Sequence, residues 1–168
     1  MIYTHDIQTP LGSVLLASDG KSLTGLWFEG QKFFANGLSD RAYQKNLPVF
    51  DSTALWLSEY FSGKIPTFTP PLAPSGSDFR RAVWSALLKV PYGATTTYGE
   101  ISDALRAQGV RASAQAVGGA VAHNPISVII PCHRILGADG ILTGYAGGID
   151  KKSALLKLEG AINKAPAK

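Results

Sequence analysis

The sequence has one cysteine, Cys132, among its 168 residues. A single cysteine forms no internal disulfide and no CxxC pair, which excludes a disulfide framework and a cysteine-based structural zinc. No apolar run approaches the roughly 20 residues that cross a bilayer. The first residues lack the basic region and apolar core of a secretory signal. We therefore expect no membrane contact, a reduced thiol and a cytoplasmic location.

Charge is scarce and unevenly distributed. Charged residues make up 17% of the chain and hydrophobic residues 45%, which is typical of folded domains rather than of disordered segments. Residues 1–74 carry 5 Lys and Arg against 6 Asp and Glu, whereas residues 75–168 carry 11 against 6. A basic excess confined to the second half is expected if that half contacts nucleic acid. A solvated basic surface is the alternative explanation.

The first part of the chain has the turn signals of a small antiparallel sheet followed by a helix. Strands are expected at 13–18 and 23–28, because Asp-Gly at 19–20 is a hairpin turn signal. A weak helical pattern covers 49–61, with Ser52 as a possible N-cap. We expect this sheet and helix to form one N-terminal domain.

A composition change marks the end of that domain. Residues 68–77 contain three prolines and one glycine, which disfavours a helix or a central strand and predicts a linker. We therefore expect an N-terminal domain at 1–67, the linker at 68–77, a second domain at 78–162 and a tail at 163–168.

The second domain has the pattern of short helices joined by tight turns. Asp78 is the expected N-cap of the first helix, which stops at the Pro-Tyr-Gly of 91–93. Thr97 and Glu100 have capping-box spacing for the second helix, and the third is expected from about Ser113 to His123. Three short helices in this order suggest a helix-turn-helix. The expected fold class is α/β, with a winged helix-turn-helix-like C-terminal domain.

The third helix is unusually poor in large side chains. Gly118 and Gly119 are adjacent, and each costs about 1 kcal/mol of helix stability relative to alanine. Close packing against another helix would compensate for that cost. So would close approach to the DNA minor groove, which is only about 6 Å wide. Both explanations can hold on different faces of the helix.

The chain's one thiol lies beside a histidine. The largely apolar stretch Ser-Val-Ile-Ile at 127–130 predicts a buried strand that leads into Cys132 and His133. A thiolate is a strong nucleophile, and a nearby imidazole can take its proton. Neighbouring residues in a helix do not face each other, so His133 would reach the thiol through a water unless the backbone there is non-helical. The alternative is that Cys132 is only a small buried hydrophobe.

Glu159 lies near the end of the last helix, expected at 151–159. The helix dipole disfavours an anion at a C-terminus, so this position hints at a partner elsewhere. A solvated carboxylate at a helix end is the alternative.

The stretch NPISVIIPCHRI at 124–135 resembles the active-site signature of the O6-alkylguanine-DNA alkyltransferases, also called methylated-DNA–protein-cysteine methyltransferases. Further stretches match this family in order: FRRAVW at 79–84, VPYG at 90–93, TYGEI at 97–101, AVGG at 116–119, TGYAGG at 143–148 and LLKLEG at 155–160. The resemblance covers 76–160, and the preceding part matches only loosely. It implies a ribonuclease H-like N-terminal domain before the catalytic helix-turn-helix domain.

The resemblance implies direct, single-use DNA repair. The alkylated guanine is flipped out of the duplex, because its O6 alkyl carbon cannot be reached within the base stack. The Cys132 thiolate then takes the alkyl group irreversibly as a thioether. His133 exchanges a proton with the thiol through water, and Glu159 orients His133.

Further roles follow from the same resemblance. Tyr98 donates a proton to the purine ring, and Asn124 braces the turn before the active-site segment. Substrate contacts are implied for Ile135, Tyr145, Ala146 and Gly147. Contacts to DNA are implied for Gln115, Ala116, Gly118, Gly119 and Arg134. The expected partner is double-stranded DNA bearing O6-alkylguanine, bound through its minor groove by a monomer, with no cofactor and no metal.

One position departs from the family. Most relatives have arginine where this chain has Gln115, which lacks the stacking and charge of a guanidinium. The preceding segment at 105–111 is also slightly long. Two other functions stay open: a non-reactive module that flags damage, against which Cys132 argues, and a helix-turn-helix regulator whose cysteine senses alkylation or oxidation. Direct alkyl transfer from DNA to Cys132 would separate them.

Overall fold

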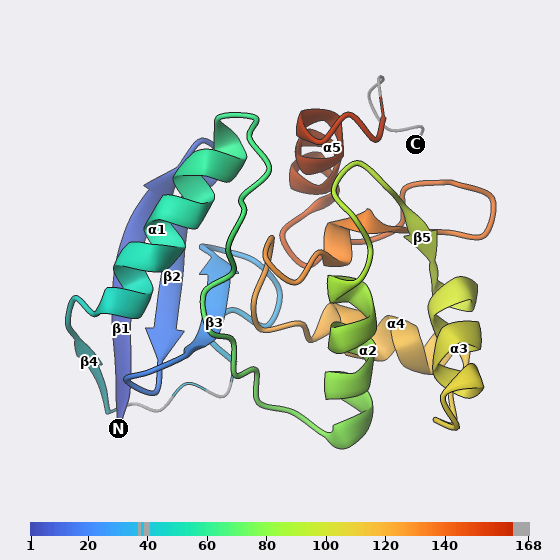
Figure 1. The fold of residues 1–168 in the computed structure, drawn as a ribbon, viewed down its shortest axis with the longest axis horizontal. Coiled ribbons are helices and arrows are strands. Elements are labelled where there is room, and N and C mark those ends of the chain that lie inside the picture. The colour runs from blue at the N-terminus through green and yellow to red at the C-terminus, as the bar shows by residue number, and fades with distance from the viewer. Residues whose placement is uncertain (37, 39–40, 163–168) are drawn as a thin grey trace. The chain divides into compact units, whose positions relative to one another are not determined.

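The computed structural model describes residues 1–36, 38 and 41–162 (Figure 1). The chain divides into two compact units, Met1–Ser75 with Pro125–Ser127, and Gly76–Asn124 with the part from Val128 onward. The division after Ser75 falls within the stretch that the sequence marks as a linker. Nothing in the sequence predicts that the later segment Pro125–Ser127 belongs to the first unit. The tail expected at 163–168 lies outside the described residues.

The first unit is built on a four-stranded sheet with the order β3-β2-β1-β4. The strands β1 (Ile2–Thr9), β2 (Gly12–Ser18) and β3 (Leu23–Phe28) pair antiparallel, as expected of a hairpin sheet. The short strand β4 (Ala42–Gln44) pairs parallel to β1 at the edge. Its three residues are too few to give a strand pattern. Asp19 stabilises the β2–β3 turn by accepting two backbone N–H bonds.

Helix α1 (Pro48–Phe61) packs along β1 and lies against the sheet (Figure 1). The N-cap expected at Ser52 is wrong, because the helix begins four residues earlier, after Leu47. That start has no side-chain cap, and Pro48 explains it: proline has the φ angle of a first helical residue and no N–H to satisfy. Phe50, Trp56 and Tyr60 are buried on the inner face.

The second unit contains three helices that pack on one another, α2 (Asp78–Leu88), α3 (Tyr98–Ala107) and α4 (Ala114–Ala122). Each begins after a capping hydroxyl. Thr97 and Ser113 cap α3 and α4 as expected. The cap expected at Asp78 is wrong by one residue, because the hydroxyl of Ser77 accepts the Arg80 N–H at 3.2 Å.

The active-site segment follows α4. A 3-10 turn, η1 (Cys132–Arg134), leads into β6 (Ile135–Leu136), which pairs parallel with β5 (Thr96–Thr97). A loop at 137–148 then reaches α5 (Ile149–Leu158), whose C-cap is Glu159. These elements complete the mixed α/β fold that the sequence predicts.

The strand expected at 127–130 is absent. Residues 127–129 form turns and Ile130 a bend. The preceding Ile126 makes an isolated bridge to Leu26 within the first unit, and the Ser127 N–H donates to the Leu26 carbonyl at 2.9 Å. Val128 has a φ of 70°, in the left-handed region that turns the chain out of an extended path. A run of apolar residues is therefore buried here without strand geometry. Within the described residues, no helix combines the length and apolar character needed to cross a membrane.

Candidate active site

Cys132 is the first residue of η1 and is 4% exposed. Asn124, just past the end of α4, holds this segment in place through its side-chain amide. Its Nδ2 donates to the Ile130 carbonyl at 2.9 Å and to the Cys132 Sγ at 3.2 Å. One asparagine therefore joins the end of α4 to the thiol.

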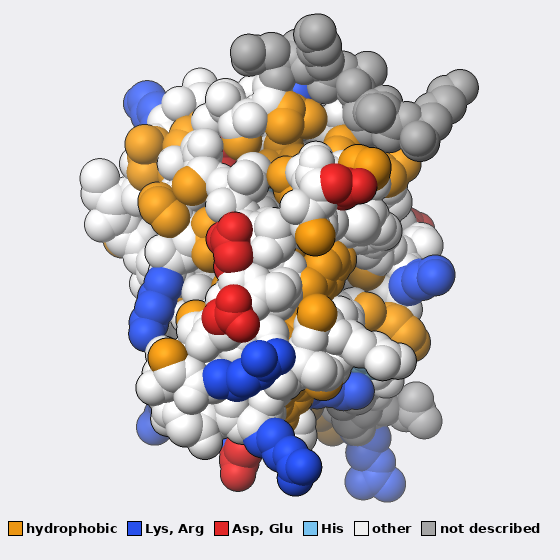
Figure 2. Space-filling model, turned by 90° about the vertical axis from the view of Figure 1, so that its right-hand side faces the viewer, with side chains coloured by type: hydrophobic (Ala, Val, Ile, Leu, Met, Phe, Trp, Pro, Cys, Tyr) orange, Lys and Arg blue, Asp and Glu red, His pale blue; other side chains and the backbone are white. Residues whose placement is uncertain are grey.

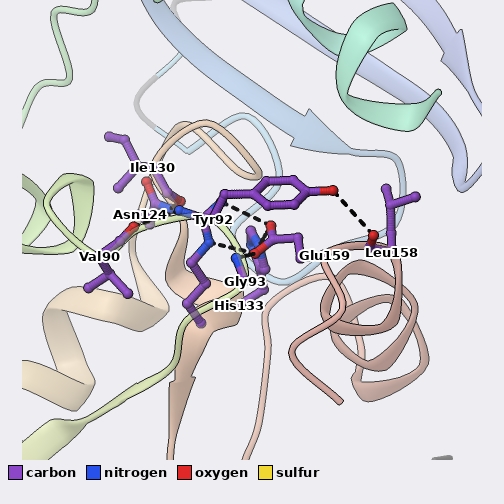
Figure 3. Close-up of polar contacts among 9 residues, drawn as sticks. Val90, Tyr92, Gly93, Asn124, Ile130, His133, Leu158 and Glu159 are labelled. Carbon is purple, nitrogen blue, oxygen red and sulfur yellow. Dashed lines mark hydrogen bonds and ion pairs between the residues drawn. The ribbon is translucent and has the colours of Figure 1, made fainter. Parts of the chain in front are cut away.

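His133 and Glu159 form a fully buried pair (Figure 3). His133 Nε2 lies 2.6 Å from Glu159 Oε2. Because a carboxylate oxygen accepts, Nε2 carries the hydrogen and Nδ1 is left as the bare nitrogen. Within the described residues Nδ1 has no hydrogen-bond partner. Burial lowers the pKa of His133, against the raising effect of Glu159, so the neutral imidazole is favoured.

Arg134 faces inward, so the DNA contact expected for its side chain is wrong. Its Nε donates to Glu159 Oε1 at 2.7 Å, its Nη2 to Oε2 at 3.0 Å and its Nη1 to the Val90 carbonyl at 2.7 Å. The residue is 8% exposed. A guanidinium bonded in this way is not available to a DNA phosphate. The sequence shows Arg134 two residues after Cys132, but it does not indicate that Glu159 is the partner of this arginine.

Glu159 is also held by the turn after α2. The Gly93 N–H donates to Glu159 Oε1 at 3.3 Å, and the Tyr92 hydroxyl donates to the Leu158 carbonyl at 3.2 Å (Figure 3). Glu159 therefore has the partners that its unfavourable place at a helix C-terminus suggested. Neither Tyr92 nor Gly93 is identified by the sequence as part of the site.

The surroundings of the thiol act on its pKa in opposite directions. Burial raises the pKa of Cys132, while the amide of Asn124, the charge of Lys152 and the hydroxyl of Tyr145 lower it. The net direction is upward, so the resting group is a protonated thiol. Its proton must leave before it can act as a nucleophile.

Lys152 is a buried cation that the sequence analysis missed. It lies on α5 and has 0% exposure. Its spacing to Leu155, Leu156 and Glu159 puts all four on one helix face, and a lysine on an apolar face is the signal that could have revealed it.

Tyr98 and the loop at 137–148 meet on one side of the site. The Tyr98 hydroxyl lies 3.0 Å from the Thr143 Oγ1. In the same loop, Tyr145, Ala146 and Gly147 are half-buried. Ile135 is fully buried in β6, where it pairs with Thr96, so its expected substrate contact stays a prediction.

The small residues of α4 lie mostly on its open face. Gln115, Ala116 and Gly119 are exposed, and Gly118 is half-buried. A Cβ added at Gly119 would meet no atom within 4 Å, and one at Gly118 would make an ordinary contact of 3.8 Å with Tyr98. Close packing within the protein therefore does not explain either glycine.

Within the described part of the chain, no group of three His, Cys, Asp or Glu side chains is placed to hold a metal ion. The absence of zinc stays a prediction, which metal analysis of the purified protein can test.

The fold and site together define a two-domain protein with a helix-turn-helix unit and an enclosed thiol beside a histidine–glutamate pair. Residues 78–161 match the family model described as "6-O-methylguanine DNA methyltransferase, DNA binding domain". Residues 2–74 match the model described as "6-O-methylguanine DNA methyltransferase, ribonuclease-like domain". The chain belongs to the 6-O-methylguanine DNA methyltransferase family.

Individual relatives agree with this assignment. The chain is 45% identical over 160 residues to the methylated-DNA–protein-cysteine methyltransferase of Haemophilus influenzae, covering 95% of this chain and 86% of that protein. It is 46% identical over 158 residues to the Methanosarcina mazei protein of the same name, covering 94% and 97%. A crystal structure of Mycobacterium tuberculosis OGT in complex with DNA superposes with a TM-score of 0.84 at 41% identity, covering 95% and 93%.

Proposed function

We propose that the protein repairs alkylated DNA by moving the alkyl group from O6 of guanine to the Sγ of Cys132, once per molecule. The observation that carries this proposal is the state of His133. Its Nε2–H is bonded to Glu159, and its bare Nδ1 is buried without a partner in the described residues. That imidazole can accept a proton from the adjacent thiol, directly or through one water. Family membership and the names of the relatives support the same reaction.

The chemistry balances without a cofactor. The thiol proton passes to His133, and the thiolate attacks the alkyl carbon in a single displacement. The new C–S bond forms as the C–O6 bond breaks, and the bonding electrons stay with the guanine. Tyr98 donates a proton to the purine ring so that the base leaves neutral. The proton held by His133 then replaces the one that Tyr98 gave up, so both groups return to their starting states. The resulting thioether does not regenerate the thiol, so each chain acts once.

DNA contact is proposed for the open face of α4. Gln115 and Ala116 lie in its first turn, and Gly119 follows one turn later on the same exposed surface. A face without large side chains can enter a minor groove, which a bulky helix cannot. On the face drawn in Figure 2, Lys and Arg side chains gather in the lower half, where phosphate contacts would add salt-dependent affinity.

The remaining parts of the proposal concern the setting of the reaction. We propose that a monomer acts on a base flipped out of double-stranded DNA, because the enclosed thiol cannot reach a stacked base. We also propose a cytoplasmic location, where a lone thiol stays reduced.

A duplex with one O6-methylguanine inside a restriction site tests the function, because the methyl group blocks cleavage. The protein should restore cleavage of one duplex per chain, and the Cys132→Ser variant should restore none. The Thr53→Val variant, altered in the first unit, should repair as the unchanged protein does. Lesion-specific binding without restored cleavage would instead support the damage-flagging function.

A further inference from the structure

Thr143 contacts two functional groups that come from different helices. Its Oγ1 lies 3.0 Å from the hydroxyl of Tyr98, the first residue of α3. The Nζ of Lys152, on α5, lies 3.4 Å from the Thr143 carbonyl oxygen and 3.5 Å from the same Oγ1. The two oxygens of one loop residue therefore face the proposed proton donor and a buried cation.

Lys152 depends on these two oxygens. Within the described residues, no carboxylate lies within ion-pair distance of its Nζ, and its only hydrogen-bond partners are the two Thr143 oxygens. Burial lowers the pKa of Lys152 to about 8, and the nearby Cys132 opposes that shift. The ammonium form therefore still predominates at neutral pH, but by a smaller margin than for an exposed lysine, so a loss of stabilisation increases the share of neutral amine.

The other groups around the thiol do not replace this charge. Arg134 and Glu159 neutralise each other, and burial favours the neutral form of His133. Asn124 and Tyr145 contribute uncharged donors. Lys152 is the cation whose field reaches Cys132 without a carboxylate beside it.

We propose that Thr143 is a positioning residue of the alkyl-transfer site, which holds the Lys152 ammonium toward Cys132 and the Tyr98 hydroxyl toward the substrate base. The proposal rests on the proposed function for the roles of Cys132 and Tyr98. It makes the loop at 137–148 a direct link between the nucleophile and the proton donor.

Local packing fits Thr143 for this position. The loop folds back where the Gly137 N–H bonds the Ile141 carbonyl at 3.0 Å. A Cβ added at Gly137 would come within 3.2 Å of the Thr143 Cγ2, so the absence of a side chain there makes room for the threonine methyl group. Because valine keeps both branches of the side chain, Thr143→Val removes the hydroxyl and leaves this packing in place.

The test compares Thr143→Val and Thr143→Ser with the unchanged protein in two assays. The first is the single-turnover rate of methyl transfer from duplex O6-methylguanine, followed by intact mass. The second is the thiolate absorbance near 240 nm during a pH titration, with Cys132→Ser subtracted, so that the chain's one cysteine is observed without DNA. Removing the contacts of the Thr143 hydroxyl with Tyr98 and Lys152 should slow transfer roughly three- to tenfold in Thr143→Val. The thiol midpoint of that variant should move upward, because a less charged Lys152 favours the thiolate less.

Serine retains the hydroxyl, so Thr143→Ser should stay close to the unchanged protein in both assays. Thr53→Val is the matched control: it removes a buried hydroxyl that bonds the Val49 carbonyl at 2.7 Å in the first unit. It should lower the melting temperature without changing the rate or the midpoint. The combination of Thr143→Val with Tyr98→Phe should slow transfer by less than the product of the two single effects.

The outcomes separate the two proposals. A Thr143→Val variant with an unchanged rate and midpoint, or a Thr143→Ser variant impaired to the same degree, would overturn the positioning role. Absence of transfer by the unchanged protein would overturn the proposed function. The thiol titration would then still decide whether Thr143 acts on Cys132 through Lys152.

Discussion

Arg134 and Glu159 are joined by two hydrogen bonds in the interior of the second unit, Nε to Oε1 at 2.7 Å and Nη2 to Oε2 at 3.0 Å. The same carboxylate accepts from His133 at 2.6 Å. Burial is the main cause of the lowered pKa of His133, and the positive charge of Arg134 lowers it further, against the raising effect of Glu159. The ion pair therefore helps to keep the imidazole neutral while Glu159 still orients it.

Replacing Arg134 should affect folding rather than the electrostatics of DNA binding. Arg134→Met leaves Glu159 as a buried charge without its arginine partner. Loss of one member of a buried ion pair costs about 3 kcal/mol of unfolding free energy. Urea unfolding measures this cost. The dependence of DNA affinity on salt should stay the same, whereas Arg111→Met, at an exposed position before α4, is the control for a surface arginine. Unchanged stability with a salt slope lower by about one would restore Arg134 as a phosphate contact.

Glu159→Gln should slow transfer, and it should also lower the free energy of unfolding, because Arg134 then lacks its carboxylate partner. The amide can present either its oxygen or its NH2 group to His133, so the bare nitrogen is no longer fixed at Nδ1. Loss of a positioned base lowers a rate on the order of a hundredfold or more. Single-turnover transfer, measured where urea unfolding shows the variant to be folded, checks this. Glu29→Gln, at an exposed position, should behave as the unchanged protein; a normal rate in Glu159→Gln would contradict the assigned role.

Acid should destabilise the fold through His133. Burial lowers its pKa from the ordinary 6.5, so the folded state binds the proton less readily than the unfolded state. The stability that this difference contributes is complete above pH 6.5 and is lost as the pH falls through the lowered value. Urea midpoints from pH 8 to pH 5 should fall less steeply for His133→Asn than for the unchanged protein. Equal slopes would mean that His133 is not the group responsible.

Alkali should destabilise the fold through Cys132, because burial raises the pKa of its thiol. Its contribution is present below the ordinary value of 9.0 and is lost as the pH rises through the raised value. Cys132→Ser removes this alkaline decline. The difference between the two urea series above pH 8 measures it, and a decline of equal size in the serine variant would refute the assignment.

Gln115→Arg should tighten binding to duplex substrate and speed transfer. A guanidinium at this exposed position in the first turn of α4 adds a charge and a stacking surface that the amide lacks. Fluorescence anisotropy should show a salt slope steeper by about one. Gln115→Met provides a long uncharged side chain as a control. If Gln115→Arg changes neither affinity nor rate, this position is not the weak point of the DNA contact.

Local signals account for what the sequence predicts well. The Asp19–Gly20 turn predicts the hairpin of β2 and β3, and capping hydroxyls at Thr97 and Ser113 mark the starts of two helices. These signals involve residues a few positions apart, so they can be recognised without knowledge of the fold. The strand expected at 127–130 fails because burial alone does not define backbone geometry, and Val128 adopts a left-handed conformation that its side chain does not announce.

Contacts between distant residues account for what the sequence misses. Arg134 and Glu159 are 25 positions apart, and their pairing becomes visible only when α5 is placed against η1. Thr143 and Tyr98 are 45 positions apart, and nothing in either segment indicates the contact. Lys152 could have been identified from the sequence, because its spacing to Leu155 and Leu156 puts it on the apolar face of the last helix.

The central claim is that Cys132 accepts one alkyl group from DNA and keeps it. Intact mass and peptide mapping, after incubation with excess duplex carrying one O6-methylguanine, test it most directly. The account predicts a gain of one methylene per chain, located on Cys132, that does not increase with further substrate and is absent from Cys132→Ser. An unmodified Cys132 after prolonged incubation, or repair of many duplexes by one chain, would contradict it.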